Sequence, residues 1–142
     1  MKTQALLLVA EDDADDQYFF QEAIRVVCPD EVEMRFVLDG AQLLNLLRQT
    51  PVDPGRRTLI VLDLNMRVKD GRATLRELKA TPAFADIPVV ILTTSNHDED
   101  VKYCQQYGAA AYYPKPSSIV DLVKIVRLLC REHLSLVPDP SR

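Results

Sequence analysis

The stretch Thr58-Leu59-Ile60-Val61-Leu62-Asp63 determines how the rest of the chain is interpreted. Its apolar residues follow one another without a helical period, which is typical of a strand buried on both faces of a parallel sheet. Asp63 would then lie at the carboxyl end of this strand, the edge at which open α/β sheets place ligands and chemistry. Taken alone, such an aspartate is more often a turn residue that ends a strand. Its role therefore depends on what the other strands bring to the same edge.

Composition excludes several classes of protein. The 142 residues carry a net charge of −4, which argues weakly against nucleic acid as the main partner. No apolar run approaches the roughly 20 residues that a membrane-spanning helix needs, and the apolar run near the N-terminus is too short for a signal peptide. We therefore expect a cytoplasmic protein with no membrane partner. The three cysteines lack metal-ligand spacing and are expected to be buried or half-buried thiols.

Strand and helix patterns alternate five times along the chain. Short apolar or alternating runs predict strands at 5–10, 32–38, 58–63, 89–92 and 109–113. Helical spacing of apolar residues predicts helices at about 14–27, 41–48, 72–80, 96–107 and 118–132, with a loop at 50–57. This alternation predicts an α/β fold with a doubly wound, five-stranded parallel sheet of order 2-1-3-4-5, the flavodoxin-like (βα)5 arrangement. We expect one domain at 1–134 and a frayed tail at 135–142.

Three local patterns make sharper predictions. Pro29 is expected to end the first helix. Ser95 and Asp98 have the spacing of a capping box, which predicts that the fourth helix begins directly after Ser95. Phe19 in the first helix and Ile119 in the last share the apolar periodicity of their helices, so both are expected to face inward.

Acidic residues follow two strands that the predicted order makes neighbours. Glu11 and Asp12 follow the first strand, and Asp63 follows the third. Three carboxylates in one small cleft repel one another unless one is protonated or a cation binds. Carboxylate oxygens suit Mg²⁺, which binds through one or two carboxylates together with a phosphate. The alternative is that the acids only cap the following helix in solvent.

Two further strands end in groups that complement a phosphate. Thr93 ends the fourth strand and Lys115 follows the fifth. A metal ion, a hydroxyl and an ammonium around a carboxylate are the groups that stabilise a phosphoryl group on that carboxylate. The acidic turn after the first strand lacks the glycines and hydroxyls that nucleotide or flavin phosphates need, which argues against those cofactors. Thr93 as an ordinary strand hydroxyl and Lys115 as a surface lysine are the structural alternatives.

Five segments, in this order, resemble a response-regulator receiver domain of the chemotaxis-regulator type. The resemblance covers about residues 4–132 and is carried by residues 9–13, 62–66, 70–71, 87–95 and 108–116. The long loop before the fourth strand and the Leu-Thr-Thr-Ser ending of that strand further resemble the stand-alone regulators associated with bacterial phytochromes.

The resemblance implies a role for each acidic candidate. Asp63 matches the phosphoacceptor. Asp12 matches the direct Mg²⁺ ligand, and Glu11 matches the acid that usually acts through water. Asn65 matches the residue whose backbone carbonyl completes the metal site and whose side chain faces it.

The resemblance also implies the parts of a switch. Thr93 matches the hydroxyl that moves to bond the phosphate, and Lys115 matches the lysine that binds it. The peptide bond before Pro116 is usually cis in the family. Tyr112 matches the aromatic residue that moves between exposed and buried rotamers, and a static half-buried tyrosine is the alternative.

Two positions depart from the family pattern. Arg67 stands where a proline is usual, two residues after Asn65, so it is expected to weaken metal binding or to pair with Asp70. Pro114 precedes Lys115 and restricts Tyr113 to extended geometry.

Together these features predict a single-domain response regulator, which is a phosphoacceptor rather than an enzyme. A sensor histidine kinase, such as a bacteriophytochrome, or a phosphotransfer protein is the expected donor to Asp63. The fourth helix, fifth strand and last helix are expected to signal to a downstream protein or to form a homodimer. One alternative is a pseudo-receiver that binds protein without phosphorylation, which Arg67 favours. Another is a metal-dependent phosphohydrolase, disfavoured because Asn65 stands where such enzymes typically have a second acid.

Overall fold

The computed structural model describes residues 5–28, 30–50 and 53–136, so the predictions for Pro29, for residues 51–52 and for the tail from 137 fall outside it. Within these ranges the strands are β1 Ala5–Ala10, β2 Val32–Val37, β3 Arg57–Leu62, β4 Val89–Thr93 and β5 Ala111–Pro114. The helices are α1 Ala14–Val27, α2 Gly40–Gln49, α3 Gly71–Ala80, α4 Asp98–Gln106 and α5 Ile119–His133. No described helix is both long enough and apolar enough to cross a bilayer.

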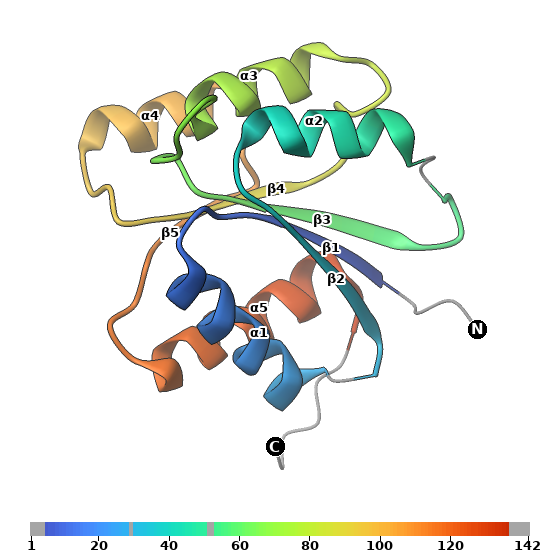
Figure 1. Cartoon of the computed structure of the whole chain (residues 1–142), viewed down its shortest axis with the longest axis vertical. Coiled ribbons are helices and arrows are strands. Elements are labelled where there is room, and N and C mark those ends of the chain that lie inside the picture. The colour runs from blue at the N-terminus through green and yellow to red at the C-terminus, as the bar shows by residue number, and fades with distance from the viewer. Residues whose placement is uncertain (1–4, 29, 51–52, 137–142) are drawn as a thin grey trace.

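The strands form one parallel sheet in the order β2-β1-β3-β4-β5, which confirms the predicted fold. Helices α1 and α5 cover one face of the sheet, and α2, α3 and α4 cover the other (Figure 1). In the register of β1 and β3, Ala10 lies opposite Leu62. The residues that follow these two strands, Glu11 and Asp63, therefore leave the sheet side by side.

The core consists of two apolar layers on either side of the sheet. Leu7 and Val9 of β1 point into the layer beneath α1 and α5, whereas Leu6 and Leu8 point into the layer beneath α2, α3 and α4. The central strands are continuously apolar because both of their faces are covered. All three cysteines are buried and none forms a disulfide, and burial raises the pKa of the Cys104 thiol to about 11.

Two side chains that were predicted to face inward are nearly half exposed. Phe19 of α1 is 47% exposed and Ile119 of α5 is 42% exposed. Both line a cavity between their helices instead of filling the core, which explains the difference from the periodicity argument. Helical spacing identifies the apolar face of a helix, but it does not show how closely the adjacent helix packs at each end of that face.

The beginning of α4 also differs from the prediction. The helix starts at Asp98, and its N-cap residue His97 makes no side-chain capping bond. Ser95 does not cap the helix, because its hydroxyl donates a hydrogen bond to the carboxylate of Asp100. The capping-box prediction was therefore wrong, and the serine has a different partner.

The chain remains packed beyond α5. Leu134 and Leu136 are buried in the layer beneath α1 and α5. The N–H of Leu136 donates a 3.0 Å hydrogen bond to the carbonyl of Cys130. Packing thus continues two residues past residue 134, where the domain was expected to end.

Candidate functional site

The ends of β1 and β3 bring three carboxylates together. The N–H of Asp63 donates to the carbonyl of Ala10 at 3.2 Å, which holds the two strand ends in register. Carboxylate oxygens of Glu11, Asp12 and Asp63 lie within 4.8 Å of one another. Glu11 and Asp63 are each only 5% exposed, whereas Asp12 is half-buried. The predicted meeting of the acids at one crevice is therefore observed.

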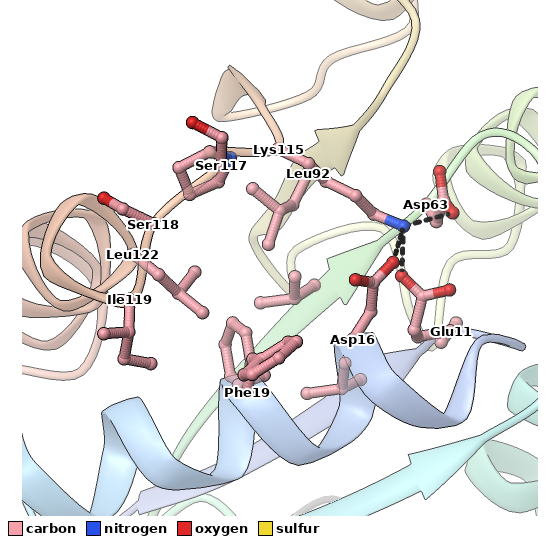
Figure 2. Close-up of a pocket in the computed structure, with 15 residues that line it drawn as sticks. Glu11, Asp16, Phe19, Asp63, Leu92, Lys115, Ser117, Ser118, Ile119 and Leu122 are labelled. Carbon is pink, nitrogen blue, oxygen red and sulfur yellow. Dashed lines mark hydrogen bonds and ion pairs between the residues drawn. The ribbon is translucent and has the colours of Figure 1, made fainter.

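Lys115 places its ammonium among these acids (Figure 2). Its Nζ lies 2.5 Å from Glu11 Oε1, 2.7 Å from Asp16 Oδ2 and 3.0 Å from Asp63 Oδ2. The backbone N–H of Lys115 donates to the carbonyl of Thr93 at 2.7 Å, so the end of β4 fixes the backbone position of the lysine. The lysine therefore bridges the carboxylates that follow β1 and β3.

The electrostatics of the cluster favour an added cation. Burial raises the pKa of Glu11, and the hydrogen bond from Lys115 offsets part of this effect. Burial would lower the pKa of Lys115, but hydrogen bonds to Asp16 and Glu11 and the charge of Asp63 raise it above its ordinary value. The lysine therefore stays protonated, and its one positive charge neutralises only one of the three carboxylates that it contacts.

Asp16 is the member of the cluster that the sequence analysis missed as a site residue. It was interpreted only as a favourable charge in the first turn of a helix. It reaches the cluster from the first turn of α1, where its Oδ2 lies 2.7 Å from Lys115 Nζ. Asp13, between them, accepts the N–H of Asp16 at 3.0 Å and caps α1.

The loop after β3 folds back onto Asp63. The N–H of Asn65 donates to Asp63 Oδ1 at 3.2 Å, so each oxygen of this carboxylate has a donor. The amide side chain of Asn65 lies 3.5 Å from Thr94 Oγ. A Cβ at Gly71 would lie 2.1 Å from the carbonyl oxygen of Asp63, so only glycine fits where α3 begins. Val68, within this loop, has φ of 62°, a strained value for a β-branched residue.

Arg67 lies beside the acidic cluster and not beside Asp70. Its side chain is 92% exposed, and its Nε is 4.0 Å from Asp12 Oδ2. The expected pairing with Asp70 was wrong, because the carboxylate of Asp70 caps α3 by accepting the N–H of Ala73 at 3.0 Å. The guanidinium therefore lies at the limit of ion-pair distance from Asp12.

The ends of β4 and β5 contribute Thr93 and Tyr112. Thr93 is fully buried, and its Oγ accepts the N–H of Ser95 at 3.3 Å. Tyr112 is half-buried, and its hydroxyl donates to the carbonyl of Ser95 at 2.7 Å. The described residues contain no cis peptide bond, so the bond before Pro116 is trans, contrary to what the resemblance implied. The trans form is the more stable one for most X–Pro bonds.

An apolar cavity of about 420 Å³ extends from the acidic cluster between α1 and α5. Val9, Val61 and Leu92 contribute to its lining from the sheet. Phe19 and Ile119 line it from the two helices (Figure 2). Asp63 and Lys115 lie at its charged end. The cluster is thus accessible from a largely apolar surface.

The residues present fit a hard divalent cation. All the candidate side-chain ligands are carboxylate oxygens, the donor type that Mg²⁺ prefers. Their uncompensated negative charge is a further reason for a cation to bind. The protein is thus an α/β domain with a doubly wound parallel sheet. Its candidate cation site lies at the neighbouring ends of β1 and β3, beside a lysine that follows β5.

Comparison with known proteins identifies the family. The model of the response regulator receiver domain matches residues 7–127, and the chain therefore belongs to this family of two-component signalling domains. The chain is 35% identical to response regulator Rcp1 of Synechocystis over 124 residues, which cover 86% of this chain and 84% of Rcp1.

Solved structures agree with this assignment. The phosphorylated cyanobacterial phytochrome response regulator RcpA superposes with a TM-score of 0.82 at 30% identity, covering 96% of this chain and 99% of RcpA. The Mn²⁺-bound form of Rcp1 superposes with a TM-score of 0.79 at 33% identity, with the same coverage. The chain is therefore similar over nearly its whole length to regulators solved in phosphorylated and metal-bound forms.

Proposed function

We propose that this chain is a single-domain response regulator that accepts a phosphoryl group from a histidine kinase on Asp63, with Mg²⁺, in the cytoplasm. The observation that carries the proposal is the contact of one ammonium, that of Lys115, with both Glu11 and Asp63. This contact joins the candidate phosphoacceptor to the candidate metal ligands. The phosphorylated and Mn²⁺-bound relatives support the same assignment.

The geometry around Asp63 supports its role as a nucleophile. A carboxylate oxygen of Asp63 forms a bond to phosphorus while the bond from phosphorus to the donor's imidazole nitrogen breaks, and the imidazole leaves with its electron pair. The N–H of Asn65 and the ammonium of Lys115 orient the two oxygens of the carboxylate. Mg²⁺ held by Glu11, Asp12 and Asp63, with the carbonyl of Asn65, would supply positive charge that neutralises the phosphoryl oxygens.

Other residues of this chain complete the phosphate environment. Lys115 is already beside Asp63 and supplies a permanent positive charge to the transferred group. The hydroxyl of Thr93 supplies a hydrogen-bond donor, because its oxygen already accepts from Ser95 and its proton is available. Tyr112 bonds to the same loop, which links this site to the α4–β5–α5 face through which we propose that the signal is passed.

The apolar cavity supports a protein donor. Phe19 and Ile119 are nearly half exposed and line the cavity that leads to the charged cluster, and large apolar groups near a reactive site favour contact with a protein surface. A sensor kinase, such as a bacteriophytochrome, or a phosphotransfer protein packs against this rim while its phosphohistidine reaches Asp63.

Incubation with acetyl phosphate tests the proposal without the kinase. The intact mass of the wild type should increase by one phosphoryl group when Mg²⁺ is present, and not when it is chelated. The variant Asp63→Asn should show no increase. Equal labelling of wild type and Asp63→Asn would refute the assignment of Asp63.

A phosphorylation-independent binding module is the second candidate, and the position of Arg67 favours it. Its Nε lies 4.0 Å from Asp12 Oδ2, so the guanidinium brings one positive charge beside a candidate metal ligand. Removing the Arg67 guanidinium distinguishes a binding module from a phosphoacceptor. If Arg67→Ala is needed before Mg²⁺ binds or acetyl phosphate reacts, the wild type is the binding module; if the wild type already does both, it is the phosphoacceptor.

A further inference from the structure

Ser95 is a junction between the candidate phosphate site and α4. Its N–H donates to Thr93 Oγ at 3.3 Å, and its carbonyl accepts the Tyr112 hydroxyl at 2.7 Å. Its own hydroxyl donates to the carboxylate of Asp100 in the first turn of α4. All three polar groups of Ser95 therefore have partners, and two of these partners are the residues expected to switch.

Asp100 is in turn fixed from α3. Arg72 Nε lies 2.6 Å from Asp100 Oδ1, and Arg72 Nη2 lies 2.7 Å from Oδ2. The side chain of Asp100 is only 11% exposed, and that of Arg72 is 31% exposed. Two parallel bonds from a planar guanidinium fix both distance and orientation. Arg72, Asp100 and Ser95 thus form a continuous network, called here the Arg72/Asp100/Ser95 network.

This network holds the start of α4 in the absence of a side-chain N-cap hydrogen bond. His97, the N-cap residue of α4, makes no side-chain capping bond. The negative charge of Asp100 suits the first turn of α4, and Arg72 followed by Ser95 lowers its pKa to about 2. Asp100 therefore stays charged at neutral pH. The position of the loop before α4 depends on Ser95, which Asp100 and Arg72 hold.

We propose that Arg72 and Asp100 are positioning residues for phosphoryl binding, acting through Ser95. They hold the Ser95 N–H against the oxygen of Thr93, which leaves the hydroxyl proton of Thr93 available for a phosphoryl oxygen. They also hold the Ser95 carbonyl where it receives Tyr112. The loop is therefore set for the phosphorylated state before phosphorylation occurs. This inference rests on the proposed function of Asp63.

The variants Asp100→Ala and Arg72→Ala test the network, with Asp100→Asn and Arg72→Lys as milder forms if the alanine variants do not fold. Glu77→Gln is the matched control. Glu77 lies on the same helix as Arg72 and pairs with Lys69 at 3.1 Å, and it has no contact with Ser95 among the described interactions. Circular dichroism verifies that each variant is folded at the temperature used.

Two readouts separate positioning from stability. The first is the affinity of the Mg²⁺-loaded protein for beryllofluoride, a phosphoryl analogue. The second is the fluorine NMR signal of Tyr112 in protein labelled with fluorotyrosine, assigned by its loss in Tyr112→Phe. We expect each alanine variant to bind beryllofluoride about 3- to 10-fold more weakly, the effect of losing one net hydrogen bond. The Tyr112 signal should move toward that of exposed tyrosine, and Glu77→Gln should change neither readout.

The combination of Arg72→Ala with Asp100→Ala should weaken beryllofluoride binding no more than Asp100→Ala alone, because both residues act through the same serine. Unchanged affinity with an unchanged Tyr112 signal in folded variants would overturn the proposal and leave the network a purely structural feature. Tighter binding would also overturn it, because the network would then oppose the phosphorylated state. If the wild type itself fails to bind beryllofluoride, the proposed function fails, while the Tyr112 signal without the analogue still tests the network.

Discussion

Replacing Lys115 with methionine should have opposite effects on metal binding and on phosphorylation. The ammonium lies within 3.0 Å of carboxylate oxygens of both Glu11 and Asp63. A divalent ion bound to the same carboxylates would lie roughly 5 Å from that ammonium, given metal–oxygen distances of about 2 Å. At water-like permittivity their repulsion is about 1.7 kcal/mol, and salt screening reduces it. The variant should therefore bind Mg²⁺ about 5- to 20-fold more tightly.

Phosphorylation of the same variant should be slower, because the transferred group loses a positive charge beside Asp63. We expect the initial rate with acetyl phosphate at saturating Mg²⁺ to fall at least about 10-fold, in the range found when one charge-stabilising group is removed. Calorimetric titration with Mg²⁺ and the rate of mass increase measure the two effects. Lys124→Met is the control, since it removes the same charge at a side chain that is 70% exposed and pairs with Asp121. Equal Mg²⁺ affinities in the two variants would refute this electrostatic reasoning.

Three further predictions concern Phe19 in the cavity, Gly71 at the start of α3, and the stability that Asp100 contributes as the pH falls. Phe19→Ala should slow phosphoryl transfer from a histidine kinase about 10-fold, as expected for a hot-spot residue of an interface, and leave the rate with acetyl phosphate unchanged. Tyr18 does not line the cavity, so Tyr18→Ala should change neither rate. A slower reaction of Phe19→Ala with both donors would show that Phe19 has a structural role. Gly71→Ala should lower the free energy of unfolding by about 3 kcal/mol or more, because the added Cβ would lie 2.1 Å from a backbone oxygen. Gly55→Ala should change it by less than about 1 kcal/mol. Equal midpoints of the two variants in denaturant unfolding would contradict the packing argument. The folded-state pKa of Asp100, about 2, is below its ordinary value of 3.8, so the stability that it contributes is full above pH 4 and is lost as the pH falls toward 2. The wild type should therefore exceed Asp100→Asn by up to about 2 kcal/mol in urea unfolding at pH 6, and most of this difference should be lost by pH 2. A difference at pH 2 as large as that at pH 6 would exclude the charge as its source.

Residues tied to strand ends were predictable from the sequence. Glu11, Asp63 and Lys115 each follow a short apolar run, and the strand order alone brings their backbones to one edge. Parallel pairing fixes the register to one residue, because a slip would turn every side chain to the other face. The meeting of these three groups therefore follows from pattern and topology without knowledge of side-chain packing.

Features that depend on local competition were not predictable in the same way. Ser95 has the spacing of a capping residue, but Asp100, held by Arg72 from another helix, accepts its hydroxyl. Phe19 has the spacing of a core residue, but the gap between α1 and α5 leaves it lining a cavity. Both outcomes are decided by distances between elements, which a sequence pattern does not contain.

The site of phosphorylation tests the central claim most directly. After reaction with acetyl phosphate and Mg²⁺, reduction with borohydride converts an aspartyl phosphate to homoserine, which peptide mass mapping locates. We expect this conversion at Asp63 alone, and only when Mg²⁺ is present. Conversion at Asp12 or Asp16 in place of Asp63, or conversion that is independent of the metal, would contradict the account of the acidic cluster given above.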